Sequence, residues 1–263
     1  MSRLEDSEAA FRNSLRGQWG HPLEFHEELT STQDRLRELA ETDAPAGTCV
    51  ITDHQVTGRG QHGRRWEARP GQGLLFSLLL RPALPAAELA GLPSLIASLA
   101  LLRSLALLEL DLSLRWPNDL MAGPRKLAGI LMEGRIEGEH YRYLALGIGL
   151  NLGQARVDFP PDLAETAASL RQLLGQAPIA EDILAGFLIE MENLWTRLEK
   201  GEGQALIEMW KEHWGDSMHI VRTRNGPLHA MDIDEQGGLV LGTIGGVEEI
   251  LYDSQSILNW EDF

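Results

Sequence analysis

The residues best suited to chemistry lie in one short segment, residues 58–66, with the sequence Gly-Arg-Gly-Gln-His-Gly-Arg-Arg-Trp. Its glycines let the backbone approach a ligand closely and offer N–H groups. Its arginines offer planar donors for a carboxylate or a phosphate, and its tryptophan offers a face for a flat heterocycle. In a chain of formal net charge -16, this segment predicts an anion-binding loop that also stacks a base.

The same segment contains Gly-x-Gly-x-x-Gly, the spacing of dinucleotide-binding loops. That interpretation fails on its context, because such a loop opens a helix directly and Pro70-Gly71 stops any helix here. The next apolar run, residues 74–80, also ends at Arg81-Pro82 without the acidic residue that would bind a ribose. An arginine-bearing surface turn remains the alternative on these residues alone.

Two further segments place single charged residues beside strands. Residues 115–120, Arg-Trp-Pro-Asn-Asp-Leu, put Asn118 and Asp119 after a proline that fixes the turn. An aspartate there can hold Mg²⁺ or its waters, whereas an Asx-turn is the structural alternative. Lys126 begins the apolar run of residues 126–133 and is conspicuous, because the chain has only three lysines. The structural alternative for Lys126 is a surface cation at the start of a strand.

Two more segments carry polar groups next to regular elements. Residues 147–152, Gly-Ile-Gly-Leu-Asn-Leu, put two glycines and Asn151 at the end of a buried strand. They indicate either a ligand contact or a bulge or tight turn. Residues 31–33, Ser-Thr-Gln, precede a helical segment, where their hydroxyls cap the helix whether or not they also bind a ligand.

Composition limits the class of protein. The chain is 43% hydrophobic and 24% charged, as in soluble globular proteins. Its acidic balance argues against a nucleic-acid surface, so we expect no specific DNA binding. Residues 1–20 are too polar for a signal peptide, and a proline and two charged residues interrupt the apolar residues 89–110. We therefore expect a cytoplasmic protein without membrane contact, with its single Cys49 as a buried hydrophobe.

Hydrophobic periodicity and turn residues predict the elements that position these groups. We expect an amphipathic arm or helix within residues 1–20 and strands at 23–29, 47–52, 74–80, 112–116, 126–133 and 141–148, the last two pairing as a hairpin. We expect helices at residues 33–40, 89–110, 181–200 and 203–214, and a helical end to residues 159–174. From residue 218 onward, short alternating runs separated by glycine turns predict a small all-β module.

In order and content, four of these segments resemble the biotin–protein ligases: the glycine–arginine loop, Arg-Trp-Pro-Asn-Asp-Leu, Lys-Leu-Ala-Gly-Ile-Leu and Gly-Ile-Gly-Leu-Asn-Leu. Residues 159–170 and 226–239 also resemble that family, so the resemblance extends from about residue 24 to the C-terminus. It implies an α+β fold, with a mixed β-sheet catalytic domain that carries helices on one side and a small SH3-like β-barrel after it. The implied domains are an N-terminal arm at residues 1–20, a catalytic domain at 21–214 and a C-terminal barrel at 215–263.

The resemblance implies biotinylation in two steps. Biotin and MgATP first give biotinyl-5′-adenylate and pyrophosphate, and a lysine of a biotin carboxyl carrier protein then attacks the mixed anhydride. Arg59 and Lys126 would neutralise the two reacting anions and the transition state, and Asp119 would be the magnesium carboxylate. The residues implied on the biotin side are Ser31, Thr32, Gln33, Gln55, Gly58, Arg59, Gly60, Gln61, Lys126, Gly129 and Ile130, and those on the ATP side are Arg64, Trp66, Asn118 and Asn151.

Two departures from the family pattern stand out. Gln61 occupies a position where many members have arginine. Only about twenty residues precede the resemblance, too few for the helix-turn-helix of larger members, so we expect a ligase that is not a repressor. A lipoate–protein ligase or octanoyltransferase of the same fold is the first alternative, and the loop sequence argues against it. A non-catalytic biotin-binding regulator is the second, and the presence of Lys126, Arg59 and Asp119 argues against it. Whether the chain forms a homodimer is left open.

Overall fold

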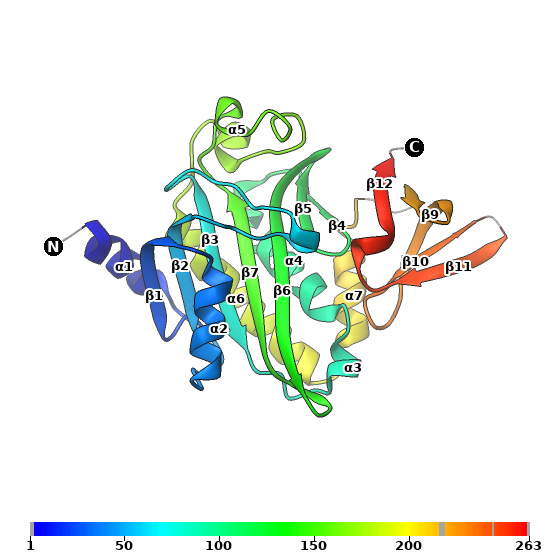
Figure 1. Cartoon of the computed structure of the whole chain (residues 1–263), viewed down its shortest axis with the longest axis horizontal. Helices are drawn as coiled ribbons and strands as arrows, with labels where there is room; N and C mark the ends of the chain where they lie inside the picture. The colour runs from blue at the N-terminus through cyan, green and yellow to red at the C-terminus, as the bar shows by residue number, and fades with distance from the viewer. Residues whose placement is uncertain (1–2, 216–218, 244, 262–263) are drawn as a thin grey trace.

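The computed structural model describes residues 3–215, 219–243 and 245–261. Its centre is a seven-stranded sheet with the strand order β1-β2-β3-β7-β6-β5-β4 (Figure 1). Strands β1 and β2 pair in parallel and all other neighbours in this sheet are antiparallel, so the sheet is mixed, as expected. The strands are β1 (Leu23–Leu29), β2 (Cys49–Gln55), β3 (Gly73–Leu80), β4 (Ser113–Arg115), β5 (Asp119–Ala122), β6 (Arg125–Glu137) and β7 (His140–Asn151).

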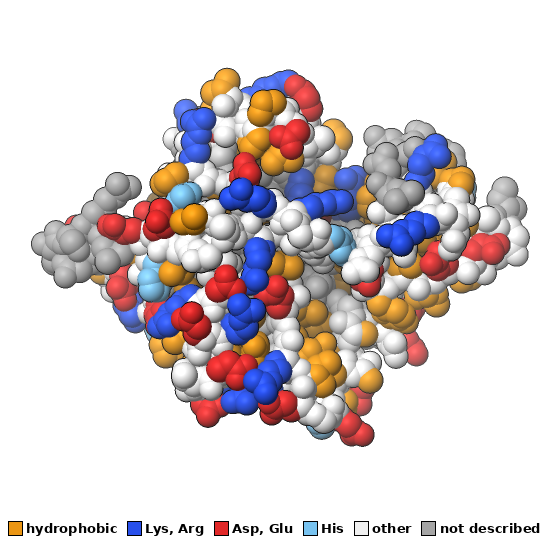
Figure 2. All heavy atoms as spheres, in the orientation of Figure 1, with side chains coloured by type: hydrophobic (Ala, Val, Ile, Leu, Met, Phe, Trp, Pro, Cys, Tyr) orange, Lys and Arg blue, Asp and Glu red, His pale blue; other side chains and the backbone are white. Residues whose placement is uncertain are grey.

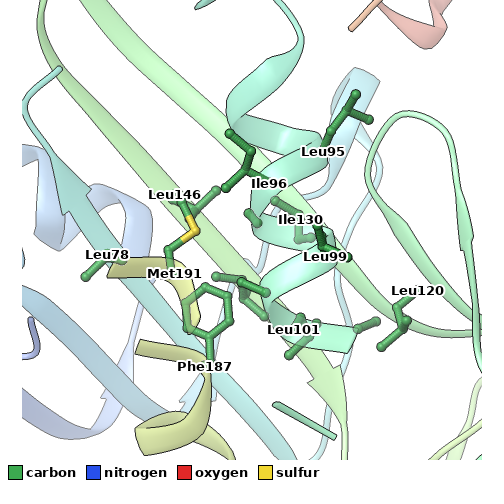
Figure 3. Close-up of a cluster of buried hydrophobic side chains, with 14 of the residues drawn as sticks. Leu78, Leu95, Ile96, Leu99, Leu101, Leu120, Ile130, Leu146, Phe187 and Met191 are labelled. Carbon is green, nitrogen blue, oxygen red and sulfur yellow. The ribbon is translucent and has the colours of Figure 1, made fainter. Parts of the chain in front are cut away.

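One face of the sheet is covered by long helices, α4 (Leu92–Ser104) and α6 (Ala180–Glu199), with α7 (Gly203–Lys211) beside them. Figure 3 shows Leu95, Ile96 and Leu99 of α4 and Phe187 and Met191 of α6 around Leu78 and Leu146 of the sheet. Alternate residues of β3 and β7 point to this face, because successive side chains of a strand lie on opposite sides. At the far edge, α1 (Arg3–Ser14) packs on β1 and α6.

The other face carries α2 (Thr32–Glu41), which places Leu36 and Ala40 against Val50 and Leu79. The expected layer of helices on one side therefore holds for α4, α6 and α7, while α2 lies opposite them (Figure 1). The outer surface of α2 is charged, and acidic and basic side chains mingle over it (Figure 2). Because Glu24 accepts hydrogen bonds from Arg35, the pKa of the Glu24 carboxyl is lowered. This face leaves room for a site beside the N-terminus of α2.

The predicted strands are confirmed, and the hairpin of residues 126–133 and 141–148 is the longer pair β6–β7. A single helix over residues 89–110 is wrong: α3 (Ala86–Leu89) ends before α4 begins, and the 3₁₀ helix η2 (Ala106–Leu108) follows α4. The break lies where the Gly91 N–H donates to the Gln236 carbonyl over 3.0 Å. A Cβ on Gly91 would lie 2.8 Å from the Gly237 oxygen. The C-terminal module thus docks at the break, and Pro93 in the first turn of α4 marks where the second helix begins.

The remaining expectations differ only at element ends. Helix α7 ends at Lys211, short of residue 214, and residues 159–174 become helical only in α5 (Leu170–Leu174), after the 3₁₀ helix η3 (Arg156–Asp158). Within the described residues, the structure has no helix long and apolar enough to span a membrane. Cys49 is fully buried, and this burial raises the pKa of its thiol.

The C-terminal module is a five-stranded antiparallel sheet with the order β11-β10-β9-β8-β12, as the turn-rich tail predicts. It is built from β8 (Ile220–Thr223), β9 (Gly226–Ile233), β10 (Leu239–Thr243), β11 (Gly246–Leu251), the 3₁₀ helix η4 (Ser254–Ser256) and β12 (Ile257–Glu261). Its contacts with the rest of the chain include a hydrogen bond from the buried Trp116 indole to the Gly237 carbonyl at 2.9 Å, and Lys211 Nζ of α7 lies 2.6 Å from Asp232. The predicted boundary at residue 215 falls between α7 and β8, and the domain division itself stays a prediction.

Candidate active site

A cavity of about 450 Å³ lies where the N-terminus of α2, strands β6 and β7, the loop of residues 58–66 and the C-terminal sheet meet. Every residue that the sequence predicts for the site, except Gly58, lines this cavity. We call the part formed by β6 and β7 the floor, and the part formed by the loop of residues 58–66 the roof. The two parts come from segments far apart in the chain.

The floor is open because two facing strands carry glycine. Gly129 of β6 and Gly149 of β7 are register partners in a regular part of the ladder, so the alternative of a bulge or tight turn does not apply at Gly149. A Cβ on Gly149 would lie 2.3 Å from Trp66 Cε2, and one on Gly129 would lie 3.0 Å from Trp66 Cζ3. The Trp66 indole thus rests on backbone that any side chain would push away. The glycines keep a flat slot in the middle of a sheet.

The start of α2 builds a rigid polar wall. Thr32 donates to Gln55 Oε1 through its backbone N–H at 2.8 Å and through its hydroxyl at 3.2 Å, and the Ser77 hydroxyl donates to Thr32 Oγ1 at 2.8 Å. Ser31 caps the helix by accepting from the Gln33 N–H, so the capping role expected for its hydroxyl is confirmed.

The Gln33 side chain is fixed from one side only. Its amide donates to the carbonyls of Leu131 and Ala145 at 3.0 and 3.1 Å. Its buried Oε1 has no hydrogen-bond partner within the described residues. A buried acceptor left without a donor is costly, so this oxygen fits a ligand N–H or O–H.

Two cations point into the same cavity, each held by carboxylates. Arg59 Nη2 lies 3.0 Å from both Asp34 and Glu133. Lys126 Nζ lies 2.5 Å from Asp119 Oδ1 and 5.8 Å from the centre of a Trp66 ring. Lys126 thus faces the cavity rather than standing at the surface as a simple strand-end cation. Both side chains are about one-third exposed, so an incoming anion can reach them.

Asp119 and the two asparagines take structural partners. Asp119 is the first residue of β5, and its carboxylate pairs with Lys126 rather than with the backbone of an Asx-turn. Asn118 clamps β6, since its side-chain amide donates to the Ile130 carbonyl and its own carbonyl accepts from the Ile130 N–H. Asn151 Oδ1 accepts from Gln154 at 3.0 Å. Within the described residues, no three acidic, histidine or cysteine side chains gather as a metal site.

The roof folds back on itself. The Trp66 backbone N–H donates to the Gly58 carbonyl at 3.0 Å, and the Gly60 backbone N–H donates to the Arg64 carbonyl at 2.8 Å. Gly58 lies outside the main cavity, and a Cβ on it would lie 2.4 Å from the Trp66 oxygen. Its glycine therefore serves to close the loop, while Arg64 lines the cavity as expected.

Several residues of the wall were missed from the sequence. Arg115 lines the cavity, and its guanidinium lies 5.8 Å from the centre of the Trp260 ring. It belongs to the Arg-Trp-Pro-Asn-Asp-Leu motif, so its place there could have been noticed. Ser254, Ile257 and Trp260 also line the cavity but come from the C-terminal module. Nothing in their local sequence connects them to the site.

Comparisons with known proteins agree with this geometry. Residues 25–151 match the model of the biotin/lipoate A/B protein ligase family. The chain is 32% identical over 251 residues to the bifunctional ligase/repressor BirA of Bacillus subtilis, covering 93% of this chain and 77% of that protein. It is 37% identical over 167 residues to the biotin–[acetyl-CoA-carboxylase] ligase of Mycobacterium tuberculosis, covering 62% of this chain and 59% of that protein.

A solved structure shows the same fold. The biotin protein ligase of Aquifex aeolicus, in complex with biotin and ATP, superposes with a TM-score of 0.73 at 26% identity and covers 90% of this chain and 97% of its own. The tenth of this chain outside the match is shorter than the C-terminal sheet, so the match includes at least part of that sheet. On sequence and on structure, the chain belongs to the biotin/lipoate A/B protein ligase family.

Proposed function

We propose that this chain is an ATP-dependent biotin–protein ligase, which forms biotinyl-5′-adenylate and transfers biotin to a lysine of a biotin carboxyl carrier protein. The observation that carries the proposal is the convergence of Arg59 and Lys126 on one cavity with a glycine floor and a polar wall. Relatives named biotin ligases and a relative solved with biotin and ATP support it.

The first step must join two anions. A carboxylate oxygen of biotin attacks the α-phosphorus of ATP, an O–P bond forms, and the bond to pyrophosphate breaks. Lys126 is suited to lie between the carboxylate and the α-phosphate. Its ammonium would leave its ion pair with Asp119 and bind a substrate oxygen. In the same way, the Arg59 guanidinium would leave its ion pairs with Asp34 and Glu133 and bind a substrate oxygen. Preorganised cations of this kind stabilise charge that develops in the transition state.

The polar wall suits a small ring that both donates and accepts hydrogen bonds. Gln33 Oε1, which has no partner within the described residues, offers an acceptor, and Ser31 and Thr32 line the same cavity. A ureido group has both kinds of partner, whereas the ring of lipoate has neither N–H nor C=O. The wall therefore favours biotin over lipoate.

The adenosine side combines an aromatic face with cations. Trp66 offers the face, Arg64 offers a phosphate donor, and Asn118 and Asn151 are the proposed adenine or ribose contacts. Mg²⁺ is commonly held in nucleotide sites by one or two carboxylates together with phosphate oxygens and waters. Asp119, the carboxylate beside Lys126, fits that requirement, and the ion would neutralise phosphate charge when bound.

The second step requires no nucleophile from this chain, because the carrier lysine attacks the mixed anhydride. Cys49, the only cysteine, is buried on the opposite side of the sheet from α2.

The proposal extends to an arm, a catalytic domain and a C-terminal barrel divided at residues 20 and 214, and to a cytoplasmic location. It also includes the absence of specific DNA binding, and a biotin- and ATP-dependent footprint on a biotin-synthesis promoter would contradict that part.

The experiment combines the purified chain with ATP, Mg²⁺, biotin and a biotin carboxyl carrier domain, and follows the mass of the carrier. We expect the mass of one biotinyl group on one lysine, and none on a carrier whose lysine is replaced by arginine. Parallel reactions with lipoate and octanoate test the alternative acids of the same family. Modification by either acid in preference to biotin would contradict the proposal.

A further inference from the structure

Ser254 of the C-terminal module hydrogen-bonds to the roof of the cavity. Ser254, the first residue of η4, donates from its hydroxyl to Gln61 Oε1 at 3.0 Å and lies 2.8 Å from His62 Nε2. The turn that carries it is fixed locally, because the Asp253 carboxylate accepts from the Gln255 N–H at 2.8 Å. Two adjacent side chains of the loop therefore converge on a hydroxyl from the other end of the chain.

The Ser254 hydroxyl can donate to one neighbour and accept from the other. A serine hydroxyl has one proton, and here Gln61 Oε1 receives it. His62 Nε2 must then be the donor to Ser254 Oγ, which both the Nε2-protonated neutral ring and the imidazolium allow. The three groups thus form one directed chain of hydrogen bonds from His62 through Ser254 to Gln61. Removing the hydroxyl would break both links together.

The loop backbone is arranged for this contact. His62 has φ 57° and ψ 35°, the left-handed region that residues other than glycine seldom adopt, and Gly63 follows it with φ 75°. Such a conformation persists only where the surroundings hold it. Ser254 supplies a partner for the His62 side chain in this conformation. Ser254, Gln61 and His62 all line the same cavity, so the contact lies at its edge.

We propose that Ser254 is a positioning residue that latches the loop of residues 58–66 to the C-terminal module, and that this latch retains the adenylate between the two steps. The inference rests on the proposed function, because it concerns the same intermediate. Ser254 acts through Gln61 and His62 and need not touch the reacting atoms. Opening the latch would let Trp66 and Arg64 move away from the floor with the rest of the loop.

The first test needs no ligand. Trypsin can cut the loop after Arg59, Arg64 or Arg65 once it opens, and mass spectrometry measures the rate of each cut. We expect Ser254→Ala to raise these rates about fivefold, the effect of losing two partly exposed hydrogen bonds. Ser254→Thr, which keeps the hydroxyl, should restore most of the protection. The matched control is Ser256→Ala, since Ser256 belongs to the same turn and does not line the cavity.

The second test measures release of biotinyl-adenylate from the complete chain. We expect Ser254→Ala to release it about fivefold faster than wild type, equivalent to about 1 kcal/mol, with Ser256→Ala unchanged. Equal cleavage rates and equal release rates for the two alanine variants would overturn the latch. Faster cleavage without faster release would overturn its role in retention. If the wild-type chain forms no adenylate, the proposed function fails, whereas the trypsin comparison still decides whether Ser254 holds the loop.

Discussion

The floor and the roof of the cavity are built in different ways. The floor consists of paired backbone in the middle of a seven-stranded sheet, where Gly129 pairs with Gly149. The roof is a loop that folds on itself and meets the rest of the molecule largely through side chains, among them the contact of Gln61 and His62 with Ser254. The floor can move only if strand pairing in the sheet breaks, whereas the roof can open by breaking a few hydrogen bonds.

From this difference we expect the floor and the roof to control different steps. Groups fixed to the floor, above all Lys126 at the start of β6, should determine how fast the adenylate forms. Groups in the roof and the C-terminal module should determine how long it stays. Changes in the floor should therefore have larger effects on adenylation than changes in the roof.

The largest effect is expected from Lys126→Ala. Loss of one preorganised charge aimed at a transition state slows catalysis by about 100- to 1,000-fold. Because Asp119 is partly exposed, water can solvate its carboxylate after the substitution and the fold should be kept. The measurement is the rate of adenylate formation together with the thermal unfolding midpoint, with the exposed Lys200→Ala as control. Adenylation within a few-fold of wild type would make Lys126 a bystander.

The next effect is expected from Gly149→Ala. The added methyl would lie 2.3 Å from Trp66, so the indole must move off the floor. Overpacking of this kind costs about 1–3 kcal/mol, which corresponds to about a 5- to 150-fold loss of adenylation. Gly153→Ala is the matched control, because its methyl would meet only ordinary contacts at 3.6 Å. Equal activities of the two variants would show that the glycine floor does not matter.

Removal of residues 216–263 should have an intermediate effect on ligation, because it also removes the contact that Ser254 makes with the roof. The shortened chain loses Ser254 and Trp260 from the cavity wall and the acceptor for the buried Trp116 indole. Because the cavity loses part of its wall and a buried donor loses its acceptor, we expect at least about a tenfold loss of ligation and a lower unfolding temperature. Full activity in carrier labelling would reduce the C-terminal module to a passive appendage.

The smallest effect is expected from Gln61→Arg. Arginine cannot accept the Ser254 proton, so the substitution adds charge but removes a hydrogen bond. We expect His62 to keep its contact with Ser254 and the dissociation rate of biotinyl-adenylate to change by less than about tenfold. A rate that falls tenfold or more, about 1.4 kcal/mol, would mean that Gln61 leaves the roof less tightly held than arginine does.

The sequence predicts the floor better than the roof. Apolar alternation locates the strands, and motifs place Lys126, Asp119 and the loop near one another through their resemblance to a family. The break at Gly91 has a local signal, because Pro93 lies in the first turn of α4, whereas its contact with residues 236–237 could not be predicted, because that module is distant in the chain. Ser254 and Trp260 were missed for the same reason. Local patterns record which face of an element is buried, but they do not record which distant turn docks on it.

The most direct test of the account is biotin-dependent exchange of labelled pyrophosphate into ATP, measured for wild type and for Lys126→Ala with biotin, lipoate and octanoate. This exchange reports the reversible first step alone and needs no carrier protein. We predict exchange with biotin, little or none with the other two acids, and loss of exchange in Lys126→Ala. Exchange that depends on lipoate or octanoate instead, or that is unchanged in Lys126→Ala, would contradict it.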